Sequence, residues 1–187
     1  MNKSYYHRGG ETPLLGQTIP EHFARIVSRF PNRNAVISTP QHLQLSYIEL
    51  SKQADLVARG LLSFNFCPGD RIGIWSSNNL QWILLQLATA RIGVILVNIN
   101  PAYRTQELEY ALKQSQVQCL VTIPAFKKSN YIDMLAELLP DLQHAPLDNI
   151  NSKILPALRR IIVFDPQNVE STTVECSGLT TWPDLIK

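Results

Sequence analysis

Residues 69–112 read GDRIGIWSSNNLQWILLQLATARIGVILVNINPAYRTQELEYAL, and this stretch decides the fold. A short apolar run at residues 72–75 is typical of a strand that is covered on both faces. The helix predicted over Leu80–Ile92 is apolar on nearly every side, so we expect it to be buried. Gly93 ends that helix, and a second apolar run at residues 94–97 predicts a second buried strand. Strand, helix and strand within about thirty residues make a βαβ unit with a right-handed crossover.

The residues outside this unit predict further elements of the same sheet. Apolar runs at residues 118–123 and 160–164 predict two more buried strands. Ser46 and Glu49 have the spacing of a capping box, which starts a helix that extends to about Phe64. We also expect a helix over residues 20–30 with Phe23, Ile26, Val27 and Phe30 facing the core, a hairpin from residues 35–38 and 42–45, a helix over residues 131–139, and a helical turn at residues 182–186. The expected fold class is α/β: a mainly parallel sheet with flanking helices and a short N-terminal hairpin.

Polar residues precede the helices of the central unit. Asn78 or Asn79 is expected to cap the helix Leu80–Ile92 by accepting from its free amides. Thr105 is the expected cap of the helix that follows the second strand. The polar side chains at residues 76–79 would also suit a phosphate at the start of the helix, but capping alone accounts for them.

The composition is that of a globular domain with a hydrophobic core. The chain has 187 residues, of which 45% are hydrophobic and 17% charged, and its formal net charge is +2. This charge is too small, and its basic residues too scattered, to indicate nucleic-acid binding. No apolar run reaches the roughly 20 residues that span a membrane, because Arg91 interrupts the longest one. The first twenty residues lack the continuous apolar core of a secretory signal. Only Lys3 and Arg8 among them are basic, which does not support a mitochondrial presequence, so we expect a cytoplasmic protein.

The cysteines and histidines do not predict a reactive site. Cys67, Cys119 and Cys176 are widely spaced, whereas a zinc site needs ligands paired at short spacing. Cys119 lies in an apolar run and is expected to be a small buried hydrophobe. The histidines at positions 7, 22, 42 and 144 have no serine, cysteine or carboxylate pattern that indicates a triad. We therefore assign no catalytic residue and no metal ligand.

Several short motifs occur in a fixed order along the chain. They are PLLGQTI at 13–19, GDRIGI at 69–74, Asn78, Trp82, ARIG at 90–93, NINPAY at 98–103 followed by Glu107 and Leu108, and PALRRIIVFD at 156–165. Together they resemble the N-terminal part of the adenylate-forming enzymes, and among these the medium-chain acyl-CoA synthetases. The resemblance implies an extended arm over residues 1–18 and a partial N-terminal α/β domain over residues 19–187.

The resemblance also implies a function. Enzymes of this family activate a fatty acid with ATP and Mg²⁺ and then transfer the acyl group to the thiol of CoA. Their phosphate loop is rich in Ser, Thr and Gly and ends in Pro-Lys-Gly, and the 187 residues contain no such run. We therefore expect an N-terminal fragment of a fatty-acid CoA ligase that binds no cofactor and is inactive alone. We also expect the DNA after the Lys187 codon to encode this loop.

The turn from Asn100 to Arg104 contains the candidate binding residue. Some members of the family place a basic residue of this turn against the phosphates of CoA, so the resemblance makes Arg104 a candidate CoA contact. Arginine suits phosphate because it offers paired donors. Ala102 directly follows Pro101 here, which displaces the match. The structural alternative is that Pro101 fixes the turn and Arg104 is solvated.

Two functions of other classes remain open. A stand-alone, non-enzymatic α/β binding module would have the same fold with polar residues on its surface, whereas a fragment would expose an apolar sheet face through which it associates. A dinucleotide-binding oxidoreductase would need a Gly-x-Gly-x-x-Gly turn after the first strand. The sequence at 76–79 is Ser-Ser-Asn-Asn, so this third function is the weakest of the three.

Overall fold

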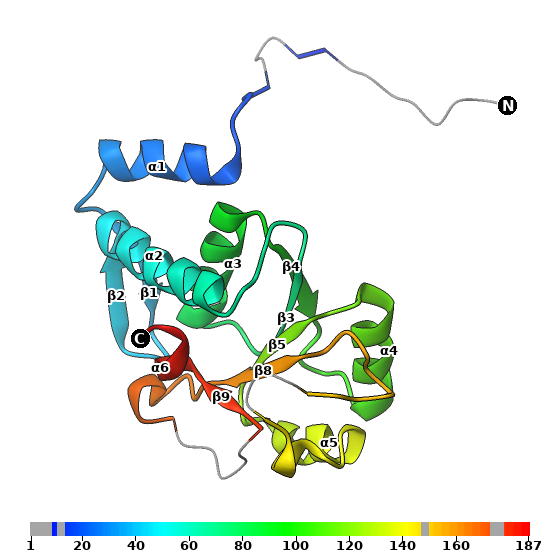
Figure 1. Ribbon diagram of the computed structural model, residues 1–187. Helices are drawn as coiled ribbons and strands as arrows, with labels where there is room; N and C mark the ends of the chain where they lie inside the picture. The colour runs from blue at the N-terminus through cyan, green and yellow to red at the C-terminus, as the bar shows by residue number, and fades with distance from the viewer. Residues whose placement is uncertain (1–8, 11–13, 147–149, 173–177) are drawn as a thin grey trace, which may run out of the picture.

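A five-stranded parallel sheet forms the centre of the computed structural model, which describes residues 9–10, 14–146, 150–172 and 178–187 (Figure 1). Its order is β4-β3-β5-β8-β9, and each neighbouring pair runs parallel. The strands are β3 (Arg71–Trp75), β4 (Ile95–Ile99), β5 (Cys119–Thr122), β8 (Arg160–Val163) and β9 (Thr180–Thr181). The sheet confirms the predicted α/β class and contains all four strands that the sequence predicted.

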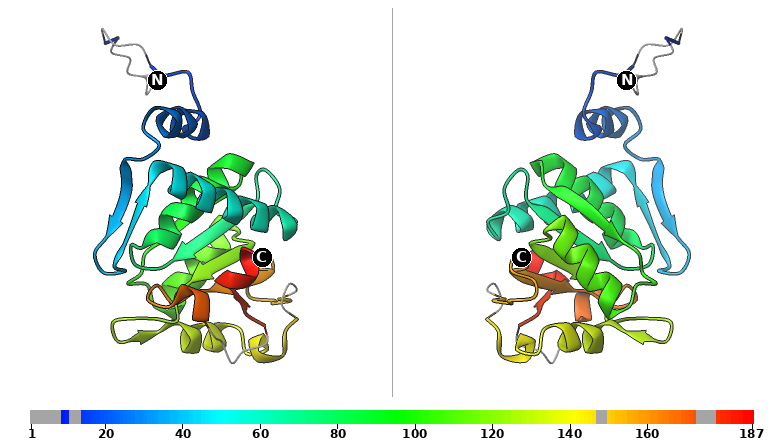
Figure 2. Two further views of the ribbon diagram at one scale, coloured as in Figure 1. Left: turned by 90° about the vertical axis from the view of Figure 1, so that its left-hand side faces the viewer. Right: turned by 90° about the vertical axis from the view of Figure 1, so that its right-hand side faces the viewer.

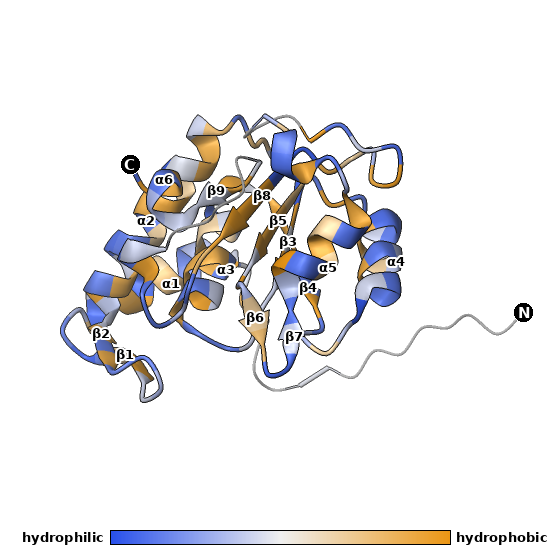
Figure 3. Ribbon diagram, turned by 90° about the horizontal axis from the view of Figure 1, so that it is seen from below, coloured by the Kyte–Doolittle hydropathy of each residue, from blue (hydrophilic) through white to orange (hydrophobic). Residues whose placement is uncertain are grey.

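Helices cover both faces of this sheet (Figures 1 and 3). One layer holds α2 (Tyr47–Ser63), α3 (Leu80–Ile92) and α6 (Trp182–Leu185), and the opposite layer holds α4 (Thr105–Ser115) and α5 (Tyr131–Leu138). The chain steps from β3 to β4 through α3 and then returns across β3 to β5 through α4. Two crossovers of the same hand in opposite directions must lie on opposite faces, as these do.

The helix starts follow from their capping residues. Ser46 and Glu49 form the predicted capping box, in which the Ser46 amide donates to the Glu49 carboxylate at 2.8 Å. Asn79 is the cap of α3, and Gly93 ends that helix in the left-handed region with φ of 72°. The expectation of a Thr105 cap is wrong, because α4 begins at Thr105 and the Glu107 carboxylate instead accepts from the amide of Arg104 at 2.9 Å.

The helix α1 (Ile19–Arg29) lies outside the two helical layers, at one end of the molecule (Figure 2). The expected core face of this helix is only half-buried, and none of its residues is fully buried. Ile19 is 66% exposed. The reason is position: α1 packs on α2 and α3 rather than on the sheet, so only one side of its apolar stripe has a partner.

The burial expected for the central βαβ unit is partly wrong. Trp82, Ile83 and Leu87 on the outer side of α3 are only half-buried, whereas the polar Gln81 is buried. The strand β4 is an edge strand with Ile95 46% exposed. The exposed large apolar side chains of the described residues include Ile95 on the edge strand β4 and Leu56 and Leu62 on α2.

Close contacts hold the layers together. Arg91 of α3 donates to the carbonyl of Ser51 at 3.0 Å and pairs with the carboxylate of Asp55, both on α2. A Cβ atom at Gly60 would lie 1.7 Å from the carbonyl oxygen of Leu185, so α2 approaches α6 more closely there than any side chain allows.

Smaller elements complete the fold. The hairpin of β1 (Asn34–Ser38) and β2 (Leu43–Ser46) was predicted, as were α5 and α6. The sequence did not predict the hairpin of β6 (Ala125–Phe126) and β7 (Ser129–Asn130), the strand β9, or the short 3₁₀ helices η1 (Leu142–His144) and η2 (Val169–Ser171). A membrane-crossing helix is not found in the described ranges.

Candidate functional site

The loop between β3 and α3 lies at the carboxyl edge of the sheet, where parallel sheets usually bind ligands. Ser76 and Asn79 of this loop are 1% and 8% exposed. The Asn79 side-chain amide donates to the Ser76 hydroxyl and to the Ser77 carbonyl, each at 2.7 Å. The polar side chains of the loop therefore bond to one another and hold its shape.

Two of the first three amides of α3 are also bonded within the protein. The amide of Leu80 donates to the Gln41 side chain at 2.8 Å, and that of Trp82 donates to Asn79 Oδ1 at 3.0 Å. A phosphate at a helix start needs such amides to be free. Ser76 to Asn79 therefore suit capping and do not fit the phosphates of ATP.

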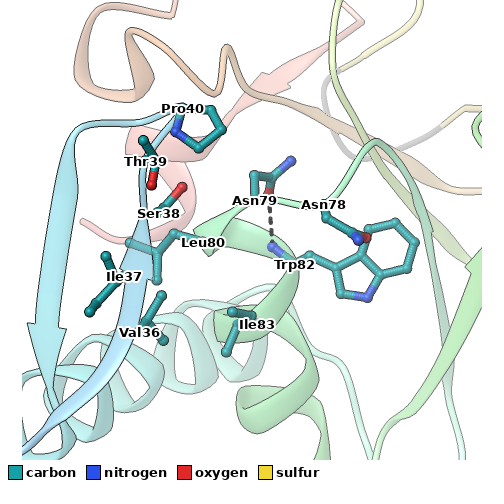
Figure 4. Close-up of a pocket in the computed structure, with 10 residues that line it drawn as sticks. All are labelled: Val36, Ile37, Ser38, Thr39, Pro40, Asn78, Asn79, Leu80, Trp82 and Ile83. Carbon is teal, nitrogen blue, oxygen red and sulfur yellow. Dashed lines mark hydrogen bonds between the residues drawn. The ribbon is translucent and has the colours of Figure 1, made fainter.

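A groove of about 510 Å³ lies between this helix start and the β1–β2 hairpin (Figure 4). Apolar side chains of Val36, Ile37, Leu80, Trp82 and Ile83 form most of its lining. Ser38, Thr39, Asn78 and Asn79 supply its polar atoms, and none of its lining residues carries a charge. Such a lining suits apolar contact and offers no acid, base or nucleophile pair.

Gln41, in the turn of the β1–β2 hairpin, bonds to two other parts of the chain, the start of α3 and the segment at Pro166. Besides accepting from Leu80, its side chain donates to Gln81 Oε1 at 3.1 Å and to the Pro166 carbonyl at 3.0 Å. The hydrogen bond from Gln41 explains why the polar side chain of Gln81 is buried on α3. This role could not be predicted from the sequence, because Gln41 lies in a hairpin turn and these three partners are 39 to 125 residues away.

The turn from Asn100 to Arg104 follows β4 at the same edge of the sheet. Two aromatic donors hold it: Trp75 Nε1 donates to the Asn100 carbonyl at 3.2 Å, and the Tyr131 hydroxyl donates to the Pro101 carbonyl at 2.5 Å. The Asn100 side chain also accepts from the Ala102 amide at 2.9 Å. The turn is therefore fixed by side chains of β3 and α5 as well as by proline.

Arg104 is exposed at the end of this turn. Its Nη1 donates to the Ser129 hydroxyl at 2.8 Å, which directs the guanidinium toward the β6–β7 hairpin. Lys127 and Lys128 form the exposed tip of that hairpin. An arginine has five N–H donors, so one bond to serine leaves the group able to fork onto a phosphate. These residues fit a phosphate at the surface, whereas the start of α3 does not.

Burial disfavours the charged form of two titratable groups in the described interior. Burial raises the pKa of the Cys119 thiol to about 12, and burial raises the pKa of Tyr131 to about 12 as well. Cys119 is thus the small buried hydrophobe that the sequence predicted. Cys67 is exposed, while Cys176 and His7 lie outside the described residues. The described ranges contain no cluster of three metal-ligating side chains.

Comparison with known proteins identifies relatives of this chain. Residues 23–176 match the model of the family described as AMP-binding enzyme. The mitochondrial medium-chain acyl-CoA ligase ACSF2 of Danio rerio is 36% identical over 167 residues, which cover 89% of this chain and 28% of the relative. The human protein of that name is 36% identical over 162 residues, covering 87% and 26%. The chain therefore spans about a quarter of the length of the curated relatives that it matches.

Solved structures show the same fold. Coronafacic acid ligase from Pectobacterium brasiliense, in a mutant form, superimposes with a TM-score of 0.69 at 20% identity, covering 91% of this chain and 29% of the other. The anthranilate CoA ligase AuaEII in complex with anthranoyl-AMP gives a TM-score of 0.70 at 18% identity, covering 91% and 28%. At these identities the likeness supports the fold alone.

These findings correct one expectation and establish the family. The expected cytoplasmic location is contradicted, because the relatives at 36% identity are mitochondrial enzymes. The count of basic residues among the first twenty was too weak a basis for assigning a compartment. The family match over residues 23–176 and the relatives agree with the resemblance found in the sequence. The chain belongs to the AMP-binding enzyme family.

Proposed function

We propose that this chain is the N-terminal part of a fatty-acid CoA ligase, which uses ATP, Mg²⁺ and CoA to convert a medium-chain fatty acid to its thioester. The observation that carries the proposal is the 36% identity to a medium-chain acyl-CoA ligase over 89% of the chain. In this proposal residues 1–18 are an extended arm and residues 19–187 are part of the N-terminal α/β domain.

We further propose that this region supplies scaffold rather than the reaction centre. The 187 residues lack a Ser/Thr/Gly-rich run ending in Pro-Lys-Gly. The start of α3, which lies at the carboxyl edge of the sheet, is capped by Gln41 and Asn79. Stabilising the charge that develops on a polyphosphate needs several donors and a cation. We therefore expect that the chain alone neither binds ATP–Mg²⁺ nor forms an acyl adenylate.

Arg104 is the one residue that we propose to contact a cofactor. Its exposed guanidinium, next to the hairpin that carries Lys127 and Lys128, suits a phosphate of CoA. The turn that carries it is held by Trp75 and Tyr131.

The test compares this chain with a joined protein, defined as this chain followed by the part of the Danio rerio relative that lies beyond the matched region. Calorimetry is expected to show no saturable binding of ATP–Mg²⁺ by the chain alone. The joined protein is expected to release AMP only when a medium-chain fatty acid is present.

Two outcomes would contradict the proposal in different ways. Stoichiometric micromolar binding of ATP by the chain alone would show that it carries its own nucleotide site. A folded joined protein without fatty-acid-dependent AMP release would argue against a ligase and leave the non-enzymatic binding module.

A further inference from the structure

The two edges of the central sheet are built differently. The strand β9 has only the two residues Thr180–Thr181 and leads directly into α6. The strand β4 has five residues, Ile95–Ile99, with no proline and no charged side chain. Very short edge strands, charges and prolines are the usual devices that keep an edge from pairing. The edge at β9 has such a device and the edge at β4 has none.

The backbone of β4 has donors that face away from the sheet. The amide of Ile95 donates to the Asp70 carbonyl at 2.8 Å, so this amide faces β3. Amide directions alternate along a strand, which places the amides of Leu96 and Asn98 on the outer edge. Within the part of the chain that the structure describes, β4 pairs only with β3.

A groove of about 630 Å³ lies beside this edge, between β4 and α4. Val97, Ile99, Tyr103, Tyr110 and Ala111 supply its apolar lining. Tyr110 is 69% exposed and Ile95 of the neighbouring strand is 46% exposed. Glu107 is the only charged residue of the lining, so the groove suits apolar side chains and disfavours an anionic ligand.

We propose that the free edge of β4 pairs with a further β-strand of the same ligase fold, whose apolar side chains fill the groove against α4. This inference rests on the proposed function, because the occupant is the part of the fold that the relatives possess beyond the matched region. The chain spans only 28% of the Danio rerio relative, so most of the relative's fold lies beyond the matched region and could supply this strand. An added strand satisfies the Leu96 and Asn98 amides and covers Tyr110 together.

Amide hydrogen exchange tests this pairing. In the chain alone, the amides of Leu96 and Asn98 are expected to exchange quickly, whereas those of Ile72 and Ile74 in β3 exchange slowly. In the joined protein the Leu96 and Asn98 amides are expected to slow at least about tenfold, because each acquires a hydrogen-bond partner. Fast exchange there in a joined protein with protected β3 amides would overturn the inference.

Proline substitutions give a second reading. Asn98→Pro removes an outward amide, so it is expected to leave the urea midpoint of the chain alone nearly unchanged but to speed Leu96 exchange at least about tenfold in the joined protein. Val97→Pro is the matched control, since it removes an amide that faces β3 and should destabilise both proteins. Equal effects of Asn98→Pro in both proteins would overturn the inference. The same proline substitution at the matching position of the Danio rerio ligase allows amide exchange to be measured in a protein whose folding does not depend on the joined protein.

Two further observations separate this inference from the proposed function. Slow Leu96 and Asn98 exchange in the chain alone, with a dimer in sedimentation, would show that a second copy occupies the edge and would overturn the inference. AMP release measured on the same joined protein reports the proposed function independently. Release without protection of β4 removes only the edge pairing, and protection without release removes only the ligase activity.

Discussion

The indole of Trp75 and the phenol ring of Tyr131 stack with centroids 3.5 Å apart and planes 3° from parallel. Trp75 ends β3 and Tyr131 begins α5, so the stack joins a central strand to the helical layer that holds α4 and α5. Each ring also donates to the turn after β4, Trp75 to Asn100 and Tyr131 to Pro101. One aromatic pair thereby packs the core and fixes the turn that carries Arg104.

Substitutions at Tyr131 separate these two roles. Tyr131→Phe keeps the stack and removes the bond to Pro101, and we expect the free energy of unfolding to fall by about 0.5–1.5 kcal/mol. Tyr131→Ala removes the fully buried ring as well, and we expect a loss of about 3–5 kcal/mol. Urea unfolding followed by circular dichroism measures both values. Equal losses for the two variants would show that the stack itself adds nothing.

Gln41 is expected to be a stabilising residue although it lies in a turn. Gln41→Ala leaves the Leu80 amide and the buried Gln81 side chain without their partner, so we expect a loss of about 1–3 kcal/mol in the free energy of unfolding. Gln44→Ala is the matched control, because the Gln44 side chain bonds to Asn34 at the surface of the same hairpin. We expect that control to stay within about 0.5 kcal/mol of the wild type. Similar urea midpoints for both variants would contradict the bridging role.

The buried thiol predicts a loss of stability at alkaline pH. Burial raises the pKa of Cys119 from 9.0 to about 12, so the folded chain keeps a proton that the unfolded chain releases. Its stabilising contribution is full below pH 9 and is lost as the pH rises toward 12. Cys119→Ala should flatten this dependence by up to about 1.4 kcal/mol per pH unit.

The pH range for this measurement is set by Tyr131. Its pKa is raised from 10.0 to about 12 by burial, so Tyr131 adds a second loss of the same sign above pH 10. Unfolding measured between pH 9 and 10 therefore reports mainly the thiol. Parallel curves for wild type and Cys119→Ala in that interval would show that the thiol titrates normally in the folded chain.

The sequence predicted the elements better than their surroundings. The helix Leu80–Ile92 and the box of Ser46 and Glu49 were correct, because capping residues and Gly93 act on their nearest neighbours. The burial predicted for Trp82 and Ile95 was wrong, since Trp82 is half-buried and Ile95 is exposed. An apolar side chain gives no information on whether a partner lies against it. Exposure at an edge depends on strand order, which a local pattern does not contain.

The candidate site divides in the same way. Asn79 was one of the two residues predicted to cap α3, since its partner Trp82 is three residues away. The long-range contacts of Gln41 and of the Trp75–Tyr131 pair connect residues 25 to 125 positions apart, and no spacing rule predicts them. The β6–β7 hairpin was missed because its strands have only two residues each. Ser129, the partner of Arg104, was missed with it.

Arg104 provides the most direct test of a cofactor contact in this region. If its guanidinium binds a CoA phosphate, Arg104→Ala in the joined protein removes a hydrogen bond to a charged group, which is worth about 1.5–3 kcal/mol. We therefore expect the KM for CoA to rise by at least about tenfold, while the KM for ATP stays unchanged. Arg104→Lys should recover part of the affinity, because lysine keeps the charge and loses the fork of donors.

The matched control for this test is Lys113→Ala, which removes a cation at the other end of α4, where Lys113 pairs with Glu109. If Arg104 contacts a phosphate, Arg104→Ala changes the KM for CoA and Lys113→Ala does not. General electrostatic attraction would instead make both variants change the KM for CoA. Salt provides a second criterion, since an exposed guanidinium–phosphate contact weakens as ionic strength rises. A KM for CoA that is the same in the wild type and in Arg104→Ala would assign Arg104 to the alternative role, a solvated residue whose bond to Ser129 fixes the β6–β7 hairpin.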